Sequence, residues 1–376
     1  MKRIIVAIAA AAFIFAPAQA QQANVREAHL DTTQGSYTPS FKKDGSKKAP
    51  KNVILMIGDG MGMGALCAGM YINGGELTIT NLQGCGFVRT QSASDFTTDS
   101  AASGTAYACG QKTHNGALGM DVNDNPIPNI PEKVAAKGIV SGVISTDPVN
   151  GATPAAFFAH QPRRGMTDEI WADLPASKLS FIAAGDTQAF NERPEATRKA
   201  ISETFAVVDN LADAPAGADR IAYIPDNAEV KQSDENFQRG NFLAESTEYA
   251  VNYLSNKSKK GFFLMVEGAH IDHGGHANNL EVAVREVLDF DKAVEAAIRF
   301  AEKDGNTLVV ISADHETGGL ALDWFASSGY GKGIYTSYGH TPVMVPLFVY
   351  GPSSKKFICV QENSDVSNKI VDLLLK

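Results

Sequence analysis

Five short apolar runs recur along the chain, separated by more polar stretches: residues 53–57, 139–144, 262–266, 308–311 and 345–350. Uninterrupted apolar runs of this length are typical of central strands that are covered on both faces. Helical patterns lie between them, over residues 100–109, 130–137, 167–171, 245–254 and 280–303. This alternation predicts βαβ units, and therefore an α/β fold with a mostly parallel central sheet and helices on both faces.

Three segments stand outside this alternation. Residues 1–20 have the pattern of a secretory signal peptide, with a basic start, an apolar part from Ile4 to Phe15, and small residues at the cleavage site that ends at Ala20. The apolar part is shorter than the roughly 20 residues that span a bilayer. Residues 21–50 are polar and predict a loose N-terminal arm, and residues 190–242 predict a surface excursion.

These segments predict an exported protein, periplasmic or secreted, that has no membrane anchor and one large domain over residues 51–376. The chain has 376 residues, 44% of them hydrophobic, which is ample for such a core. Its net charge of −9 argues against nucleic acid as a partner. An exported chain can oxidise its cysteines, but the sequence does not choose a pairing among Cys67, Cys85, Cys109 and Cys359. Cys109 lies in a helical pattern of small residues and is predicted to be a buried thiol.

Side chains that can bind a metal follow several of the predicted strands. Asp59 follows the first strand, the segment from Glu267 to His276 follows the third, and Asp314 and His315 follow the fourth. His340 precedes the last strand. Carboxylates and imidazoles at the carboxyl edge of a parallel sheet are suitable ligands for a divalent cation. The alternative for any one of them is a helix cap, a turn residue or an exposed loop histidine.

A segment of small residues around Ser100 predicts a helix that starts there, with Asp99 or Ser100 as its N-cap. A serine at a helix N-terminus faces free N–H groups that favour an anion. Its hydroxyl is a weak nucleophile until a base or a metal helps to ionise it. The nucleophile-elbow motif of many serine hydrolases is absent. A zinc ion on the serine oxygen is therefore the favoured means of activation.

Taken together, these motifs resemble the alkaline phosphatase family from about Asn52 to the C-terminus. The resemblance rests on six motifs in order: Gly58-Asp59-Gly60, Thr98-Asp99-Ser100-Ala101-Ala102, Ala152-Thr153-Pro154-Ala155, the run from Val266 to Asp272, Asp314-His315, and Gly339-His340-Thr341. It implies hydrolysis of small-molecule phosphate monoesters through a phosphoserine, with an alkaline optimum. Only 24 residues separate His315 from His340, which is similar to short bacterial members without a large crown insertion.

The resemblance also implies a role for each matching residue. Ser100 matches the nucleophile, and Arg164 the guanidinium that binds two phosphate oxygens, with Arg163 as the competing choice. The other matches are the ligands of two zinc ions and one magnesium ion: Asp272, His276 and His340 for the first zinc; Asp59, Asp314 and His315 for the second; Asp59, Thr153 and Glu267 for the magnesium.

The chain departs from the family pattern at three positions near these sites. Gly151 stands where relatives carry Asp or His near the third metal, and Thr317 where a histidine often supports the first-zinc aspartate. His273 stands where others have Lys, Trp or His. It is a candidate phosphate contact, with a solvent-exposed loop histidine as the alternative. These departures leave the occupancy and identity of the third metal open.

Other functions are also compatible with the sequence. A phosphodiesterase, phosphomutase or sulfatase would use the same scaffold, although the C/S-x-P-x-R setting of sulfatases is missing around Ser100. A periplasmic phosphate- or metal-binding protein would keep the ligands but would need no nucleophile. The sequence does not name the physiological ester, and it leaves both a monomer and a homodimer open.

Overall fold

A computed structural model describes residues 24–185, 187–226 and 239–376. Its centre is a ten-stranded sheet in the order β15-β3-β14-β9-β2-β8-β4-β5-β7-β6. The strands in that order are β15 (Val360–Glu362), β3 (Gly84–Arg89), β14 (Val345–Tyr350), β9 (Thr307–Ser312), β2 (Asn52–Gly58), β8 (Phe262–Gly268), β4 (Val140–Pro148), β5 (Leu179–Gly185), β7 (Ile221–Tyr223) and β6 (Ala206–Val208). Strand β14 runs antiparallel to β3 and β9, and the other neighbours pair in parallel. The predicted α/β fold with a mostly parallel sheet is confirmed.

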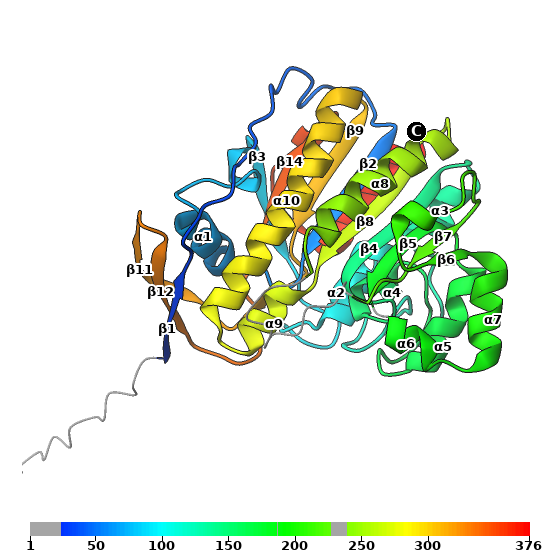
Figure 1. The fold of residues 1–376 in the computed structure, drawn as a ribbon, viewed down its shortest axis with the longest axis horizontal. Helices are drawn as coiled ribbons and strands as arrows, with labels where there is room; N and C mark the ends of the chain where they lie inside the picture. Colours follow the sequence, from blue (N-terminus) through cyan, green and yellow to red (C-terminus); the bar gives the residue numbers. More distant parts are fainter. Residues whose placement is uncertain (1–23, 186, 227–238) are drawn as a thin grey trace, which may run out of the picture.

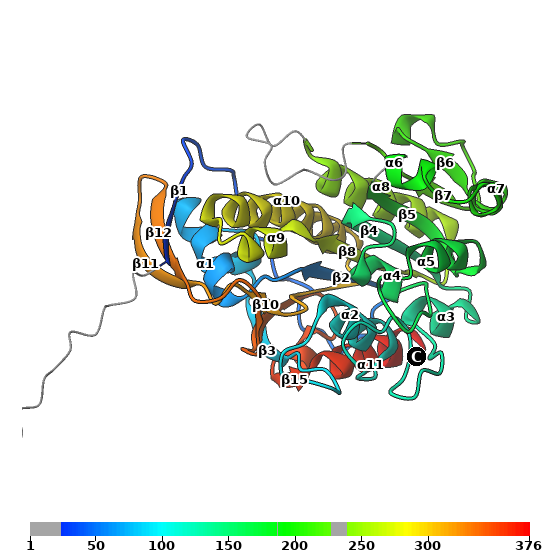
Figure 2. The same ribbon diagram turned by 90° about the horizontal axis from the view of Figure 1, so that it is seen from below.

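Helices cover both faces of this sheet (Figures 1 and 2). One face carries α1 (Met63–Ile72), α8 (Phe242–Lys257), α9 (His270–His276) and α10 (Leu280–Asp304), and the other carries α2 (Ser100–Cys109), α3 (Ile130–Ala135) and α11 (Asn363–Leu374). Every residue of β2, β8 and β9 is buried between the two layers. Burial of one large apolar side chain stabilises the fold by about 1.5–3 kcal/mol, which explains why these strands read as continuous apolar runs.

The smaller helices lie at the ends of the sheet. The helices α5 (Thr167–Asp173), α6 (Thr187–Asn191) and α7 (Glu195–Thr204) surround the end that holds β5 to β7 (Figure 1), whereas α4 (Ala152–Ala156) packs on α2 beside β4 and β8. At the opposite end, β1 (Asn24–His29), β12 (Tyr330–Tyr335) and β11 (Ala321–Ala326) form a separate antiparallel sheet. Two short strands, β10 (Glu316–Thr317) and β13 (His340–Thr341), pair beside the main sheet.

Two predictions about the flanking segments need correction. Residues 24–29 of the expected loose arm form β1, which is held by a full register of pairs with β12. The expected surface excursion over residues 190–242 contains α7 and two edge strands of the main sheet, β6 and β7. Both strands of that pair are three residues long, which is too short for periodicity to show. The predicted signal peptide, residues 1–20, lies outside the described residues.

Other sequence predictions concern the cysteines and the membrane. The four cysteines are free thiols, so the structure shows no disulfide among them. Cys109 is buried on α2 as predicted, and burial raises the pKa of its thiol to about 12. Among the described helices, none combines the length and the apolar character needed to cross a bilayer.

The backbone register brings four strand ends to one level at the carboxyl edge of the sheet. Ile57 in β2 pairs with Glu267 in β8 and with Ser312 in β9, and Ser145 in β4 also pairs with Glu267. The residues that follow these positions therefore meet at one edge. The N-terminal ends of α2, α4 and α9 lie along that edge as well (Figure 1). Side chains far apart in sequence are thus placed together by strand pairing.

The contact between His160 and Glu132 allows a test of how the stability of the fold depends on pH. The His160 Nε2 atom lies 3.1 Å from Glu132 Oε1, and its Nδ1 lies 2.8 Å from the Gly119 carbonyl oxygen. The hydrogen bond to Glu132 raises the pKa of His160. Stability from a raised histidine pKa is complete below the unfolded value and is lost as the pH rises through the folded value. We expect His160→Gln to destabilise the chain by about 1 kcal/mol at acidic pH and by less at alkaline pH.

Denaturant unfolding of both chains at about pH 5.5 and pH 9 measures this difference. His114→Gln is the matched control, because His114 is an exposed histidine whose ring Nε2 atom lies 3.1 Å from the Val122 carbonyl oxygen and forms no ion pair with the described residues. An equal loss of stability at both pH values would contradict the ion-pair account.

Candidate active site

The first group of candidate ligands surrounds the buried imidazole of His315. Its Nε2 atom lies 3.2 Å from Asp314 Oδ2, 3.5 Å from Asp59 Oδ1 and 3.3 Å from the Ser100 hydroxyl. Asp59 is placed by the end of β2, and Asp314 and His315 by the end of β9. Ser100 reaches the same point from the first position of α2. The structure therefore brings together four residues that the sequence placed in three separate motifs.

The proton on His315 can be located from its neighbours. The Thr317 hydroxyl donates a hydrogen bond to Asp272, so it can only accept from the His315 Nδ1 atom, which is 3.2 Å away. That arrangement puts the proton on Nδ1 and leaves the Nε2 lone pair facing the two carboxylates and the serine. Burial, followed by the charge of His340, keeps the pKa of His315 well below its ordinary value. A neutral imidazole with its lone pair turned toward carboxylates is arranged as a metal ligand.

Thr317, which stands where relatives often have a histidine that supports the first-zinc aspartate, therefore contacts that aspartate, Asp272, itself. Its hydroxyl bridges Asp272 and His315, one residue from each of the two predicted zinc sites. The antiparallel pairing of Thr317 with His340 adds a third connection. One short side chain therefore orients ligands of both sites.

A second group consists of Asp272, His276 and His340. The Nδ1 atoms of both histidines face backbone carbonyl oxygens, at 2.6 Å from Tyr338 and 2.9 Å from Thr98. Each ring therefore donates from Nδ1 and turns Nε2 inward, where the two Nε2 atoms are 3.1 Å apart. The Asp272 oxygens lie 3.3 Å from His276 Nε2 and 3.5 Å from His340 Nε2. Two lone pairs and a carboxylate converge on one point.

The charges of this second group depend on one another. The hydrogen bond with Asp272 raises the pKa of His276 to about 9. Burial alone would raise the pKa of Asp272, but the hydrogen bond from His276 and the charges of the nearby histidines hold it well below its ordinary value. In the protein without metal, a proton on His276 therefore takes the place that a cation would fill. Metal and proton compete for the same imidazole.

A third group contains the side-chain oxygens of Asp59, Thr153 and Glu267. Thr153 lies in α4 and Glu267 in β8, and each is 1% exposed. Burial, then the charge of Asp147, raises the pKa of Glu267 well above its ordinary range. Burial and the charge of Asp314 do the same for the pKa of Asp59. Buried carboxylates that repel one another are stabilised by a cation between them.

Unsatisfied oxygen atoms support the same conclusion for these groups. Asp59 Oδ1, Asp314 Oδ2 and Thr153 Oγ1 are buried and lack a well-aligned hydrogen-bond partner in the described part of the chain. A buried polar atom without a partner costs about 1–3 kcal/mol. The residues present therefore fit divalent cations: oxygen and nitrogen donors for two, and oxygen donors alone for the third.

The predicted nucleophile and the predicted phosphate-binding arginine are connected through Asp99. This residue is the N-cap of α2, since its Oδ1 accepts a hydrogen bond from the Ala102 N–H at 2.9 Å. Its Oδ2 lies 3.7 Å from Arg164 Nη1 and accepts from the Gly116 N–H at 3.0 Å. The sequence left the cap open between Asp99 and Ser100. The structure resolves it, and Ser100 becomes the first helical residue, beside the free N–H groups of α2.

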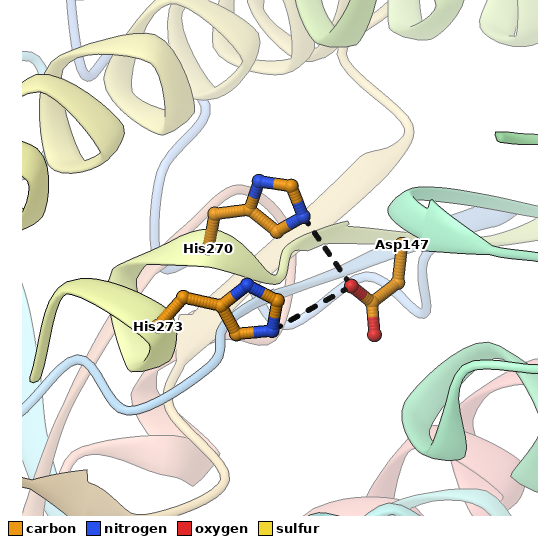
Figure 3. A group of neighbouring side chains, drawn as sticks. All are labelled: Asp147, His270 and His273. Carbon is orange, nitrogen blue, oxygen red and sulfur yellow. Dashed lines mark ion pairs between the residues drawn. The ribbon is translucent and has the colours of Figure 1, made fainter. Parts of the chain in front are cut away.

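His273 lies with two residues that the sequence analysis did not select. Figure 3 shows the rings of His270 and His273 turned toward the carboxylate of Asp147. The Asp147 Oδ1 atom is 3.4 Å from His270 Nε2 and 4.0 Å from His273 Nε2. Asp147 lies three residues beyond the strand predicted over residues 139–144, near the end of the observed β4, and His270 belongs to the segment richest in histidine. Both signals were present in the sequence, but Asp147 lies outside the family motifs, and His270, although inside the motif from Val266 to Asp272, was given no role by the resemblance.

The fold and these groups define a class of protein: an α/β protein with a candidate multi-cation centre at the carboxyl edge of its sheet, next to a serine at a helix N-terminus. The family model of alkaline phosphatase matches residues 50–190 and 226–332. Alkaline phosphatase 4 of Bacillus subtilis is 30% identical, over 90% of this chain and 93% of that protein. The chain belongs to the alkaline phosphatase family, and it is a phosphoric monoester hydrolase.

Solved structures agree with this assignment. The alkaline phosphatase from the Antarctic bacterium TAB5 aligns with a TM-score of 0.80 at 34% identity, covering 88% of this chain and 99% of that one. A variant of the TAB5 enzyme, at 35% identity and the same TM-score, is described with Mg bound in its M3 site.

Proposed function

We propose that residues 51–376 form a single catalytic domain that hydrolyses phosphate monoesters through a phosphoserine on Ser100. The observation that carries this proposal is the position of the Ser100 hydroxyl. It stands at the N-terminus of α2 and 3.3 Å from the His315 Nε2 atom, whose lone pair faces two carboxylates. A binding protein would need the anion site but not a hydroxyl directed at a cation site.

The ligand groups divide into three sites. Asp272, His276 and His340 would hold one zinc ion, and Asp59, Asp314 and His315 a second. Asp59, Thr153 and Glu267 offer oxygen alone, which suits magnesium better than zinc. When bound, the zinc ions would supply positive charge that lowers the pKa of the Ser100 hydroxyl and of the attacking water, and that stabilises the leaving oxygen.

The proposed reaction consists of two successive displacements at phosphorus. The Ser100 hydroxyl releases its proton to solvent and its oxygen forms a bond to phosphorus while the ester P–O bond breaks; the departing alkoxide takes a proton from water and leaves as the alcohol. A water oxygen then forms a bond to phosphorus while the bond to Ser100 breaks, which releases inorganic phosphate and the free hydroxyl. Arg164 holds two phosphoryl oxygens throughout, since its planar guanidinium presents two parallel N–H groups. Positioning and charge neutralisation are the main requirements of such a transfer.

Turnover of a monoester beside a diester tests this function. The purified zinc- and magnesium-loaded chain should release nitrophenol from p-nitrophenyl phosphate at alkaline pH. Its kcat/KM for bis-p-nitrophenyl phosphate should be lower by orders of magnitude. A preference for the diester would move the chain to the phosphodiesterase branch of the same scaffold.

The role of Arg164 is tested by inhibition with inorganic phosphate. A charged bidentate contact is worth roughly 1.5–3 kcal/mol, so Arg164→Ala should raise the phosphate inhibition constant by roughly 10- to 100-fold. The neighbouring Arg163→Ala is the matched control and should leave it unchanged. The ion pair between Arg164 and Asp99 favours Arg164 over Arg163 as the phosphate contact. An effect confined to Arg163→Ala would reverse the assignment.

The third site predicts a response to magnesium. Water molecules complete the coordination of an oxygen-only site, so the ion should be held loosely and exchange with the solution. Activity of the zinc-loaded chain should rise on addition of magnesium. Glu267→Gln should lose that response because it removes a negative ligand. A wild-type chain that binds three zinc ions, or shows no magnesium response, would contradict this account.

We also infer that the chain is exported. The support is the signal-peptide pattern of residues 1–20 in the sequence. Expression in a Gram-negative host should place activity outside the cytoplasm, with a mature chain that begins near Gln21 by N-terminal sequencing. A chain that keeps Met1 and stays in the cytoplasm would contradict it.

A further inference from the structure

The environment of Asp147 shows why position 151 is a glycine. Gly151 has φ −52° and ψ 147°, a conformation open to any residue, so the backbone does not require glycine there. A Cβ atom on Gly151 would lie 2.8 Å from the Asp147 Cβ and 2.9 Å from Asp147 Oδ2. The carboxylate of Asp147 therefore occupies the space that a side chain at position 151 would take.

Asp147 is held on one side by a buried charge network. Arg239 is 1% exposed and pairs with Asp289 at 2.8 Å and with Glu286, both on α10. Its Nη1 atom lies 3.3 Å from the Nδ1 of His270. A guanidinium only donates, so Nδ1 accepts and the His270 proton sits on Nε2, which faces Asp147. His270 is 1% exposed, and its Nε2 atom, which has no well-aligned hydrogen-bond partner among the described residues, lies 3.4 Å from Asp147 Oδ1.

On the other side, Asp147 faces the proposed third site. The Ser145 hydroxyl accepts a hydrogen bond from the Asp147 N–H at 2.9 Å and donates one to Glu267. The negative charge of Asp147 contributes to the raised pKa of both Glu267 and Asp59. The same carboxylate lies 4.0 Å from His273, whose ring stacks on His270 with centroids 4.5 Å apart. Asp147 thus stands between two proposed ligands and the candidate phosphate contact.

We propose that Asp147 is a positioning residue that replaces the missing side chain at position 151: it binds the water molecules around the third-site cation and orients His273 toward the phosphate. This inference rests on the proposed function. Direct binding of a metal by Asp147, His270 and His273 is the competing account. The geometry disfavours it because Arg239 occupies the Nδ1 lone pair of His270 and the proton occupies Nε2. That imidazole has no lone pair left for a metal.

The test compares magnesium affinity among zinc-loaded variants. Loss of a residue that supports a metal from outside its ligand shell typically costs 10- to 100-fold in affinity, so Asp147→Asn should weaken magnesium binding by about that factor. Asp323→Asn removes one exposed carboxylate from β11 and serves as the matched control. Bound magnesium is measured by mass spectrometry after equilibrium dialysis. The inhibition constant for phosphate and the ¹⁵N shifts of His273 provide readouts independent of turnover.

A double variant that moves the carboxylate from position 147 to position 151 tests whether the place of this carboxylate, rather than a role of Asp147 in folding, determines the magnesium affinity. Gly151→Asp alone should be destabilising, because its Cβ collides with Asp147. The double variant Asp147→Gly with Gly151→Asp removes both the Cβ and the carboxylate at position 147, so it removes that collision and returns a carboxylate to the same space. It should recover most of the lost magnesium affinity. The Pro148 carbonyl oxygen, 3.0 Å from the new Cβ, must shift by a few tenths of an ångström.

The outcomes distinguish this inference from the function on which it rests. Wild-type magnesium affinity in Asp147→Asn, or a double variant no better than Asp147→Gly alone, overturns the role of Asp147. Loss of a tightly bound metal ion in His270→Gln shows instead that the cluster is itself a metal site. A wild-type chain that binds no magnesium when zinc-loaded refutes the proposed third site.

Discussion

Ser100→Ala is expected to lower kcat for an aryl phosphate by roughly 10³-fold or more, a loss of the size seen when a covalent nucleophile is removed. The variant should still bind phosphate, because Arg164 and the N–H groups of α2 remain. The substitution should fold, because it removes a single hydroxyl from a 5% exposed side chain in a helix of small residues. Zinc content should stay the same, since the candidate ligands are side chains other than Ser100.

Acid quenching during turnover of labelled substrate measures the mechanism directly. Wild-type protein should carry the label on Ser100, and Ser100→Ala should carry none. Ser367→Ala is the matched control: it removes a fully buried serine hydroxyl on α11 and should keep wild-type activity. Label that is absent from the wild type in the pre-steady state would favour direct attack by water. Label on another residue would show that the nucleophile has been misassigned.

The sequence predicted best the parts of the fold that are determined by local chemistry. Helix α2 begins and ends at the predicted residues because Asp99 caps its start and Gly110, with φ 74°, ends it in a left-handed conformation. Strand β14 also matches, since it is apolar from end to end. By contrast, β1 is a partly exposed strand that pairs with β12 across about 300 residues of sequence. Nothing within each segment indicates its partner.

The same reasoning applies to the candidate site. Residues that carry a recognisable motif, such as Asp59 and His315, were found because the motif is local. Asp147 and His270 were missed because their importance arises only from strand register and from the approach of α9 to the end of β4. Arg239 was missed for a similar reason: its partners lie on α10, about 50 residues away. Long-range pairing decides these contacts, and no single segment reveals it.

Removal of zinc is expected to abolish turnover and to lower the thermal stability of the chain. Without a cation, Asp59 and Asp314 stay buried beside each other, and burial raises the pKa of Asp314 to about 7. A ligand present at a thousand times its Kd stabilises the folded state by about 4 kcal/mol. Exhaustive chelation should therefore lower Tm by several degrees as well as remove activity. Zinc, rather than magnesium alone, should restore both.

A variant that lacks one ligand of the first zinc site tests the same prediction for each zinc ion separately. His340→Gln should retain one of the two zinc ions, because the second site keeps Asp59, Asp314 and His315. Its turnover should fall by orders of magnitude while its Tm lies between those of the chelated and loaded wild type. The variant His114→Gln changes an exposed histidine outside the site, so it should keep both zinc ions and full activity. Full activity with no metal detected by mass spectrometry would refute the metal mechanism. Loss of both zinc ions in His340→Gln would show that the two sites bind as one unit, because Thr317 and Asp272 link them.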